Sequence, residues 1–224
     1  MRRREYGTDA CVSPLVKIGI IGAGNIGSTL VRRLTQLGHE VAVANSRRPE
    51  TLSELAAETG ATAATAAEAV ESAELVVLTI PLARVADLPP GLFAALPSAA
   101  PLVDTGNYYP GRDGSIALLE DGVPESRWVE QKIGRPVVKA FNTIRAQHLL
   151  EYGKPAGAEG RIALPVAGDD PAAKAIVLRL VDELGFDAVD AGGIDDSWRQ
   201  QPGRPAYDAD ADAATLRRLL ADAG

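Results

Sequence analysis

The chain has 224 residues, 46% of them hydrophobic, with a formal net charge of −7 at pH 7. This length suits one large or two small domains with a sizeable core. The acidic balance disfavours bulk attraction to nucleic acid or to an anionic membrane, and the longest apolar runs are strand length, too short to span a bilayer.

Residues 1–14 form the first segment of the chain. They begin Met-Arg-Arg-Arg but lack the apolar run of a secretory signal, so we expect a disordered leader. The single cysteine, Cys11, lies in this segment, which excludes an internal disulfide and suggests no thiol chemistry. Together these features favour a cytoplasmic protein.

The stretch Lys17–Asn45 is the most informative part of the sequence. An apolar run leads into Gly22-Ala23-Gly24-Asn25-Ile26-Gly27, an amphipathic helical pattern follows, and a second apolar run begins at Val41. A G-x-G-x-x-G motif between a strand and a helix predicts a dinucleotide-binding turn. In such a turn the first glycine permits the bend, the second lets the backbone approach a pyrophosphate, and the third lets the helix pack on the strand. The pyrophosphate is expected on the free N–H groups of the helix N-terminus.

The residues after the second strand indicate which dinucleotide binds. NAD sites usually place an acidic residue there to hold the ribose 2′-hydroxyl. This chain has Ser46-Arg47-Arg48 after Asn45, and no carboxylate. A hydroxyl and two guanidinium groups can hold a 2′-phosphate through charge-assisted hydrogen bonds. The sequence therefore favours NADP(H) over NAD(H).

Strand and helix signals alternate along the rest of the chain. This pattern predicts an α/β, Rossmann-type doubly wound fold with a mostly parallel sheet. We expect a dinucleotide-binding domain over residues 15–144 and a smaller C-terminal α/β extension over 145–224. The further predicted strands are Ala61–Ala64, Leu75–Ile80, Leu102–Asp104, Pro136–Phe141, Arg161–Gly168 and Asp187–Gly192. The further predicted helices are Pro49–Glu58, Thr65–Ser72, Pro171–Leu184 and Asp212–Ala221.

The carboxyl ends of the strands should supply the remaining cofactor contacts, because dinucleotides lie across those ends. For Asn107, an ordinary turn and a functional role are equally acceptable interpretations. Asn142 favours function, because a polar residue rarely follows a buried strand without a partner. The candidate residues at these ends are Thr79, Ile80, Pro81, Leu82, Asn107, Asn142, Thr143 and Ile144.

Candidates for acid–base chemistry are weak, so no catalytic residue is assigned. His39 opens the second strand and is expected to be exposed, and no carboxylate is expected to orient His148. Two histidines and one cysteine, widely spaced, give no metal-ligand pattern. Hydride transfer between stacked rings needs alignment more than proton transfer. Trp198 and Tyr207 either anchor the polar C-terminal loop or line the mouth of the pocket.

The chain resembles the NADPH-dependent deazaflavin (coenzyme F420) reductases and the wider NADP oxidoreductase family. The resemblance implies that Ala23–Ile26 contact the pyrophosphate and that Ser46 with Arg47 binds the 2′-phosphate. It also implies that Ile80–Leu82 and Asn142–Ile144 border the nicotinamide, and that the protein is a homodimer with a shallow cleft. The matching segments are Lys17–Gly27, Leu37–Val41, Ser46–Arg48, Leu78–Pro81, Val137–Ile144, Ala167–Pro171 and Asp190–Gly192.

The sequence departs from this family after Gly192. Deazaflavin reductases have a long apolar helix there, whereas this chain has the polar, loop-like segment Asp195–Pro205. Three functions therefore stay open. The first is hydride transfer between NADP(H) and a planar acceptor such as deazaflavin F420 or a flavin. The second is a non-enzymatic NADP(H) sensor. The third is a dehydrogenase of a small carbonyl or imine substrate, for which Lys139 or His148 would have to serve.

Overall fold

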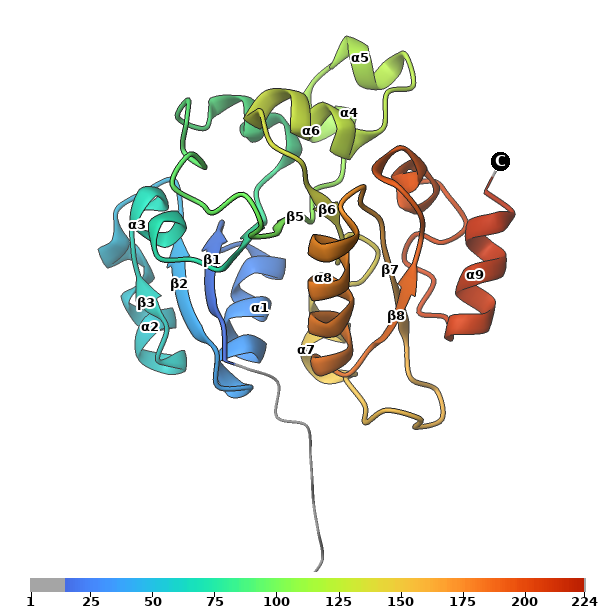
Figure 1. Ribbon diagram of the computed structural model, residues 1–224, viewed down its shortest axis with the longest axis horizontal. Helices are drawn as coiled ribbons and strands as arrows, with labels where there is room; N and C mark the ends of the chain where they lie inside the picture. Colours follow the sequence, from blue (N-terminus) through green and yellow to red (C-terminus); the bar gives the residue numbers. More distant parts are fainter. Residues whose placement is uncertain (1–14, 224) are drawn as a thin grey trace, which may run out of the picture.

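A six-stranded parallel sheet forms the centre of the molecule (Figure 1). The structure, a computed structural model, describes residues 15–223, so the expected leader and Cys11 lie outside it. The strands are ordered β3-β2-β1-β4-β5-β6, the order of a dinucleotide-binding doubly wound fold. This confirms the predicted fold class. The strands are β1 (Lys17–Ile21), β2 (Glu40–Ala44), β3 (Thr62–Ala63), β4 (Leu75–Leu78), β5 (Leu102–Asp104) and β6 (Val138–Lys139).

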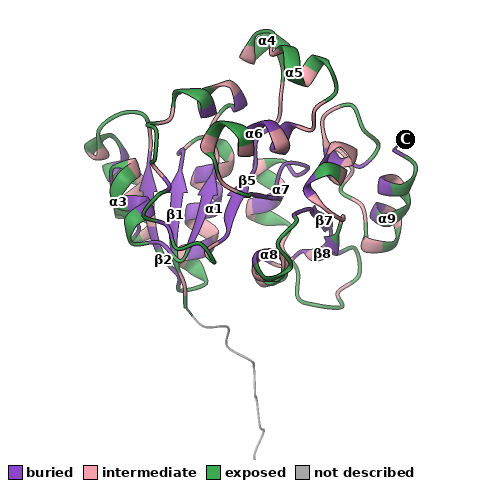
Figure 2. Cartoon of the chain, turned by 45° about the horizontal axis from the view of Figure 1, so that its top comes forward, coloured by how far each residue is buried: buried purple, intermediate pink, exposed green. Residues whose placement is uncertain are grey.

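Helices connect the strands and cover both faces of the sheet (Figures 1 and 2). The α-helices are α1 (Asn25–Gln36), α2 (Ser53–Thr59), α3 (Ala66–Glu71), α4 (Pro110–Asp113), α5 (Ala117–Glu120), α6 (Glu125–Ile133), α7 (Ala146–Glu151), α8 (Pro171–Glu183) and α9 (Ala213–Ala221). The 3-10 helices are η1 (Pro49–Leu52), η2 (Leu82–Asp87) and η3 (Ile194–Gln200). Among residues 15–223, no helix is both long enough and apolar enough to cross a membrane.

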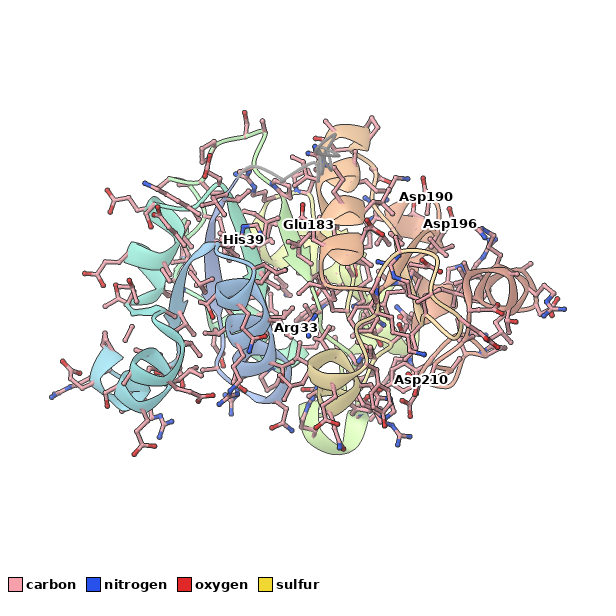
Figure 3. All side chains as sticks on the ribbon, turned by 90° about the horizontal axis from the view of Figure 1, so that it is seen from below. Arg33, His39, Glu183, Asp190, Asp196 and Asp210 are labelled. Atoms are coloured by element: carbon pink, nitrogen blue, oxygen red, sulfur yellow. The ribbon has the colours of Figure 1, made fainter. Side chains whose placement is uncertain are left out.

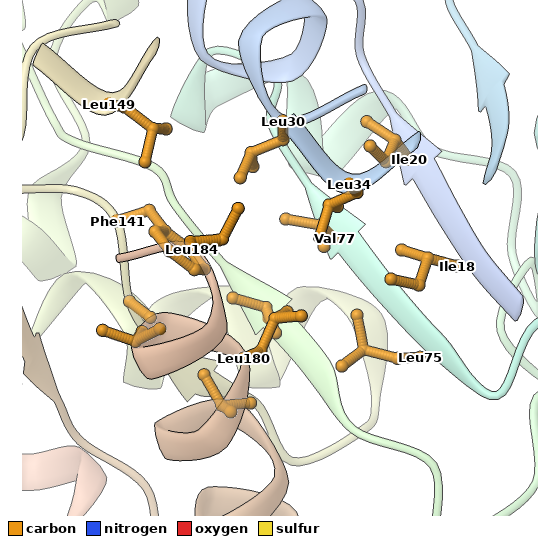
Figure 4. Packing of buried hydrophobic residues seen from close by; sticks show 14 of the residues in the cluster. Ile18, Ile20, Leu30, Leu34, Leu75, Val77, Phe141, Leu149, Leu180 and Leu184 are labelled. Atoms are coloured by element: carbon orange, nitrogen blue, oxygen red, sulfur yellow. The ribbon is translucent and has the colours of Figure 1, made fainter. Parts of the chain in front are cut away.

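Two apolar clusters hold the helices on the sheet, one on each face. Successive strand residues point to opposite faces, so Val77 joins one cluster and Val76 joins the other. The first cluster packs α1, α7 and α8 against the sheet, with Leu30 and Leu34 of α1 fully buried (Figure 4). The second packs α3, η2 and α6 on the opposite face. The strands read as nearly continuous apolar runs because both faces are covered.

The C-terminal part of the chain forms a small second sheet. Strands β7 (Ala163–Val166) and β8 (Asp187–Asp190) pair in parallel, and α9 packs on them. An antiparallel bridge between Lys139 and Ala167 joins β7 to β6. The extension has its own small cluster but also contributes α8 to the main core. We propose residue 144 as the boundary between the two parts because β6, the last strand of the main sheet, ends shortly before it and β7 of the second sheet follows it.

Most predicted elements are confirmed, with shorter strands than expected. Strand β6 has two residues where the sequence predicts Pro136–Phe141, and β3 also has two. Helices α4, α5 and α6, between residues 110 and 133, were not predicted. The first two of these helices have four residues each and no buried residue, so no apolar period marks them.

The expectation that His39 is exposed is wrong. Its side chain is 3% exposed, and its Nε2 lies 3.4 Å from the Glu183 carboxylate (Figure 3). Its Nδ1 accepts a hydrogen bond from the backbone N–H of Val16. The reason is tertiary: the end of α8, more than 140 residues further along the chain, covers the start of β2.

Candidate functional site

A cleft of about 570 Å³ opens at the carboxyl ends of the central strands. Its wall contains the glycine-rich turn after β1, the turn after β4, the loops after β5 and β6, and one C-terminal segment. This is the position where doubly wound folds bind their ligands, and the volume suits a small-molecule site. The lining residues are Gly24, Asn25, Ile26, Thr79, Ile80, Pro81, Thr105, Asn107, Tyr109, Arg112, Phe141, Asn142, Thr143, Ile144, Arg145, Ala146, Tyr207 and Asp208.

The three glycines of the turn face different surroundings. A Cβ on Gly22 would lie 2.5 Å from the Thr79 carbonyl oxygen, and Gly22 has a φ of 114° that favours glycine. A Cβ on Gly27 would lie 2.0 Å from the Gly22 carbonyl oxygen. The Thr79 hydroxyl donates to that carbonyl at 2.7 Å and so fixes the turn. A Cβ on Gly24 would meet no described atom within 4 Å. Protein packing therefore explains Gly22 and Gly27 but leaves Gly24 unexplained.

Helix α1 presents an uncapped N-terminus to the cleft. Gly24 is its N-cap, no side chain caps the first turn, and that turn contains no acidic residue. The first N–H groups of a helix lack partners within the helix, and the helix dipole favours an anion beside them. Asn25 and Ile26 of this turn line the cleft. The arrangement matches a phosphate site at a helix N-terminus.

The segment Ser46-Arg47-Arg48 lies beside this turn. Ile21 and Ala44, the last residues of β1 and β2, are paired, and the Gly22 N–H donates to the Ala44 carbonyl at 2.8 Å. The two loops therefore leave the sheet side by side. Ser46, Arg47 and Arg48 are exposed, and neither arginine forms an ion pair within residues 15–223. Their guanidinium groups are available to an anion from solvent.

Asn142 lies at the base of the cleft, and its polar atoms are already bonded. Its Nδ2 donates to the Gln200 carbonyl at 2.7 Å and to Asn107 Oδ1 at 3.1 Å, and its Oδ1 accepts from Gln200 Nε2 at 2.8 Å. The preceding residue, Phe141, has a φ of 61°, which bulky residues rarely adopt. The network ties the β5 and β6 loops to η3. The polar segment after Gly192, expected to be loop-like, thus includes a 3-10 helix that supports the site.

The outer wall of the cleft combines aromatic and charged residues from distant segments. The Tyr109 and Tyr207 hydroxyls are hydrogen bonded to each other, and the Arg112 guanidinium lies 4.9 Å from the centre of the Tyr109 ring. Arg145 forms a bidentate pair with Asp208. Tyr207 thus lines the cleft as well as anchoring its loop, whereas Trp198 packs against Arg204 and is not among the lining residues.

Sequence reasoning missed several of these residues. Tyr109 follows a strand end by five residues, so the rule that located Asn107 could have found it. Asp208 had no signal, because it is 63 residues from Arg145 in the sequence. Among the predicted residues, Ala23 and Ser46–Arg48 are not part of the cleft wall. Leu82 does not line the cleft either, because its side chain is buried in the second apolar cluster. Gly22 and Gly27 do not line the cleft, but they allow the close packing of the turn that forms its wall.

The sequence and fold of this chain are similar to those of known proteins. Residues 17–108 match a family model described as NADP oxidoreductase, coenzyme F420-dependent. A hypothetical protein from Sinorhizobium meliloti is 31% identical, with 87% of this chain and 94% of that chain covered and a TM-score of 0.70. A proposed F420-dependent NADP reductase from Arthrobacter sp. FB24 is 29% identical over 80% of this chain and 86% of that one, with a TM-score of 0.63.

The chain belongs to this NADP oxidoreductase family. The resemblance seen in the sequence is confirmed. The Escherichia coli (strain K12) protein YjhV is 52% identical over 73 residues, which span 32% of this chain and 53% of that protein. An imine reductase from Pseudomonas sp. shares the fold at 20% identity, covering 93% of this chain and 61% of that one, with a TM-score of 0.54.

Lys139 of this NADP oxidoreductase is not in the cleft. Its side chain is 0% exposed, and its ammonium lies 3.1 Å from the Asp104 carboxylate and 3.6 Å from the Glu125 carboxylate. It also donates to the Gly106 carbonyl oxygen. Burial raises the pKa of Glu125, and the attraction of Lys139 opposes that rise. Because every donor of Lys139 faces a buried acceptor, it suits a structural role and cannot reach a carbonyl or imine substrate in the cleft.

His148 of this oxidoreductase lies outside the cleft wall. A carboxylate that the sequence did not predict lies beside it: Asp210 is 2.6 Å from the Nδ1 of His148. Its ring also stacks on Tyr152. We expect His148→Ala to keep NADPH turnover within about tenfold of the wild type, whereas loss of a general acid costs roughly 10²–10⁴-fold. Steady-state kinetics on the variant check this, and a thousandfold loss with NADPH affinity intact would contradict it.

Proposed function

We propose that this protein binds NADP(H) across the cleft and transfers hydride between its nicotinamide and a planar acceptor, a deazaflavin such as F420 or a flavin. The observation that best supports this proposal is the glycine turn. Packing within the protein does not require glycine at position 24, because a Cβ there would meet no described atom within 4 Å. Gly24 nevertheless lines the cleft, at the uncapped N-terminus of α1. A backbone cradle of this kind fits a pyrophosphate.

The surrounding residues fit the other parts of the cofactor. In this proposal the turn Ala23–Ile26 holds the pyrophosphate, and Ser46 with Arg47 and Arg48 holds the 2′-phosphate. The residues after β4 and β6, Thr79–Pro81 and Asn142–Ile144, border the nicotinamide, which supplies or accepts the hydride. The hydrogen bonds from Asn142 to Gln200 and Asn107 fix the loops around that ring, and such fixed alignment accelerates transfer.

A planar acceptor suits the remaining part of the cleft. Tyr109 and Tyr207 present aromatic surface there, and Ile26, Ile80 and Ile144 contribute apolar surface. These groups can stack on a flat ring system. A homodimer and a cytoplasmic location belong to the same proposal, by analogy with the family, as does the absence of a nucleic-acid or membrane partner.

A panel of acceptors tests the reaction. NADPH oxidation is followed by absorbance with F420, with flavin mononucleotide and with a small cyclic imine. The proposal predicts turnover with F420 or the flavin. Turnover with the imine alone would replace it with the dehydrogenase function. Tight NADPH binding with no turnover on any of the three would replace it with the sensor function.

The double variant Ser46→Ala/Arg47→Ala tests the choice of dinucleotide. We expect NADPH affinity to fall by about 10- to 100-fold with little change for NADH, because only NADPH has the phosphate that these side chains hold. Each charge-assisted hydrogen bond contributes about 1.5–3 kcal/mol, and exposure places the effect at the lower end. Calorimetry with both dinucleotides measures it. Arg179→Ala, an exposed arginine on α8, is the control, and an equal loss for both dinucleotides would remove the 2′-phosphate assignment.

A further inference from the structure

Two phenol hydroxyls meet at the outer wall of the cleft. Tyr109 comes from the loop after β5, and Tyr207 comes from the C-terminal segment 98 residues further along the chain. Both side chains line the cleft, and their hydroxyl groups are hydrogen bonded to each other. Neither tyrosine is among the acid–base candidates that the sequence suggests, which are histidine and lysine. A phenol is also a recognised general acid.

Neighbouring groups hold Tyr207 in its protonated form. Burial, and next the hydrogen bond with Tyr109, raise the pKa of Tyr207 well above the range of an ordinary phenol. The carboxylates of Asp208 and Glu125 act in the same direction. The Arg145 guanidinium is paired with Asp208 and so does not offset this effect fully. Tyr207 is therefore a neutral phenol at neutral pH. Because a raised pKa makes the phenol a weaker acid, its proton leaves only as the acceptor gains negative charge, and the position of the hydroxyl in the cleft carries the assignment.

Tyr109 connects Tyr207 to solvent. Its side chain is 36% exposed, whereas Tyr207 is half-buried. The orientation of Tyr109 is fixed from two sides: its backbone N–H donates to the Asp113 carboxylate at 2.9 Å, and Arg112 lies over its ring. A proton lost from Tyr207 can therefore be replaced through the Tyr109 hydroxyl without movement of either loop.

We propose that Tyr207 is the general acid that protonates the acceptor as it receives the hydride, with Tyr109 as the proton relay to solvent. This rests on the proposed function. The hydride brings two electrons from NADPH, which becomes NADP⁺, and forms a new bond on the acceptor, a C–H bond on a deazaflavin or an N–H bond on a flavin. The Tyr207 O–H bond breaks, and its proton goes to the acceptor nitrogen or oxygen that gains the electron pair. Tyr109 then reprotonates Tyr207 and takes a proton from water.

The variants Tyr207→Phe and Tyr109→Phe remove each hydroxyl and keep the aromatic ring. Tyr152→Phe is the matched control, because Tyr152 is exposed and outside the cleft. With the acceptor that the wild type reduces, we expect Tyr207→Phe to lower kcat by roughly 10²–10⁴-fold. We expect a smaller loss in Tyr109→Phe and none in Tyr152→Phe. NADP⁺ affinity, measured by calorimetry, should stay within about threefold in all three variants, because the phenols face the acceptor.

Two further readouts separate proton transfer from a structural role. Wild-type turnover should vary little between about pH 6 and 9, because the phenol stays protonated. Turnover of Tyr207→Phe should fall roughly tenfold per pH unit, because its proton must come from solvent. Without turnover, the absorption spectrum of flavin mononucleotide added to the NADP⁺ complex should shift in the wild type, through the phenol hydrogen bond, and not in Tyr207→Phe.

The outcomes distinguish this inference from the proposed function. Wild-type activity together with near-normal kcat and an unchanged pH profile in Tyr207→Phe overturns the acid role and leaves the proposed function intact. Equal loss of NADP⁺ affinity and kcat also overturns it, because the side chain would then act in binding. Failure of the wild type to reduce any acceptor removes the proposed function, and the acid role with it.

Discussion

Replacement of Gly24 by Val is expected to abolish NADPH binding while leaving the free energy of unfolding close to that of the wild type. A Cβ at this position meets no described atom within 4 Å, so the folded protein accommodates it. The backbone angles, φ −76° and ψ −164°, are extended, and a β-branched residue adopts them readily. The new side chain would instead occupy the space of the pyrophosphate.

Calorimetry with NADPH and thermal denaturation measure the two parts of this prediction. Gly111→Val is the matched control, because a Cβ there also meets no described atom within 4 Å and Gly111 lies in exposed α4. Gly27→Val provides the contrast: its Cβ would lie 2.0 Å from a carbonyl oxygen, so it should unfold the turn itself. NADPH binding by folded Gly24→Val at wild-type affinity would show that the turn does not hold the dinucleotide.

Lys139→Ala is expected to lower the free energy of unfolding by about 3–5 kcal/mol, the usual cost of removing one partner from a buried ion pair. The change leaves Asp104 and Glu125, 1% and 5% exposed, without their shared cation. Chemical denaturation measures the loss. Lys17→Ala, at the exposed start of β1, should change stability by less than about 0.5 kcal/mol. A folded, equally stable Lys139→Ala that lost only turnover would return Lys139 to the catalytic candidates.

The pH dependence of this loss follows from Glu125. Its pKa is raised in the folded protein by burial, so its contribution to stability is fully present below the ordinary carboxyl pKa of 4.5 and is lost as the pH rises through the folded value. Lys139 opposes the rise. Removing Lys139 raises the folded pKa further, so the variant should lose more stability at pH 7 than at pH 5. Adding Glu125→Gln should restore part of it.

The fold and the part of the cleft formed by the ends of β1 and β4 could be predicted because their signals are local. A strand, Gly22–Gly27 and a helix follow one another within about 20 residues, and parallel strands bring the residues after β1, β2 and β4 to one edge. The contribution of the C-terminal segment could not be predicted in the same way. Tyr207 lines the cleft and Gln200 supports it through contacts across 98 and 58 residues, which no sequence period encodes.

The same distinction explains the individual errors. His39 was expected to be exposed because it lies in a Gly-His-Glu turn, but the covering residue, Glu183, comes from α8. Leu82 was placed at the cleft because it follows the end of a predicted strand. The start of η2 turns the Leu82 side chain into the second apolar cluster instead. For both residues, a contact with a distant part of the chain determines where the side chain lies.

A calorimetric titration of the full chain with NADPH and, in parallel, with NADH tests the central claim most directly. The glycine turn, the uncapped start of α1 and the exposed arginines after β2 predict one NADPH per chain, bound at least about tenfold more tightly than NADH. NADH bound as tightly as NADPH would contradict the assignment of the 2′-phosphate, and binding of neither dinucleotide would contradict the assignment of the cleft.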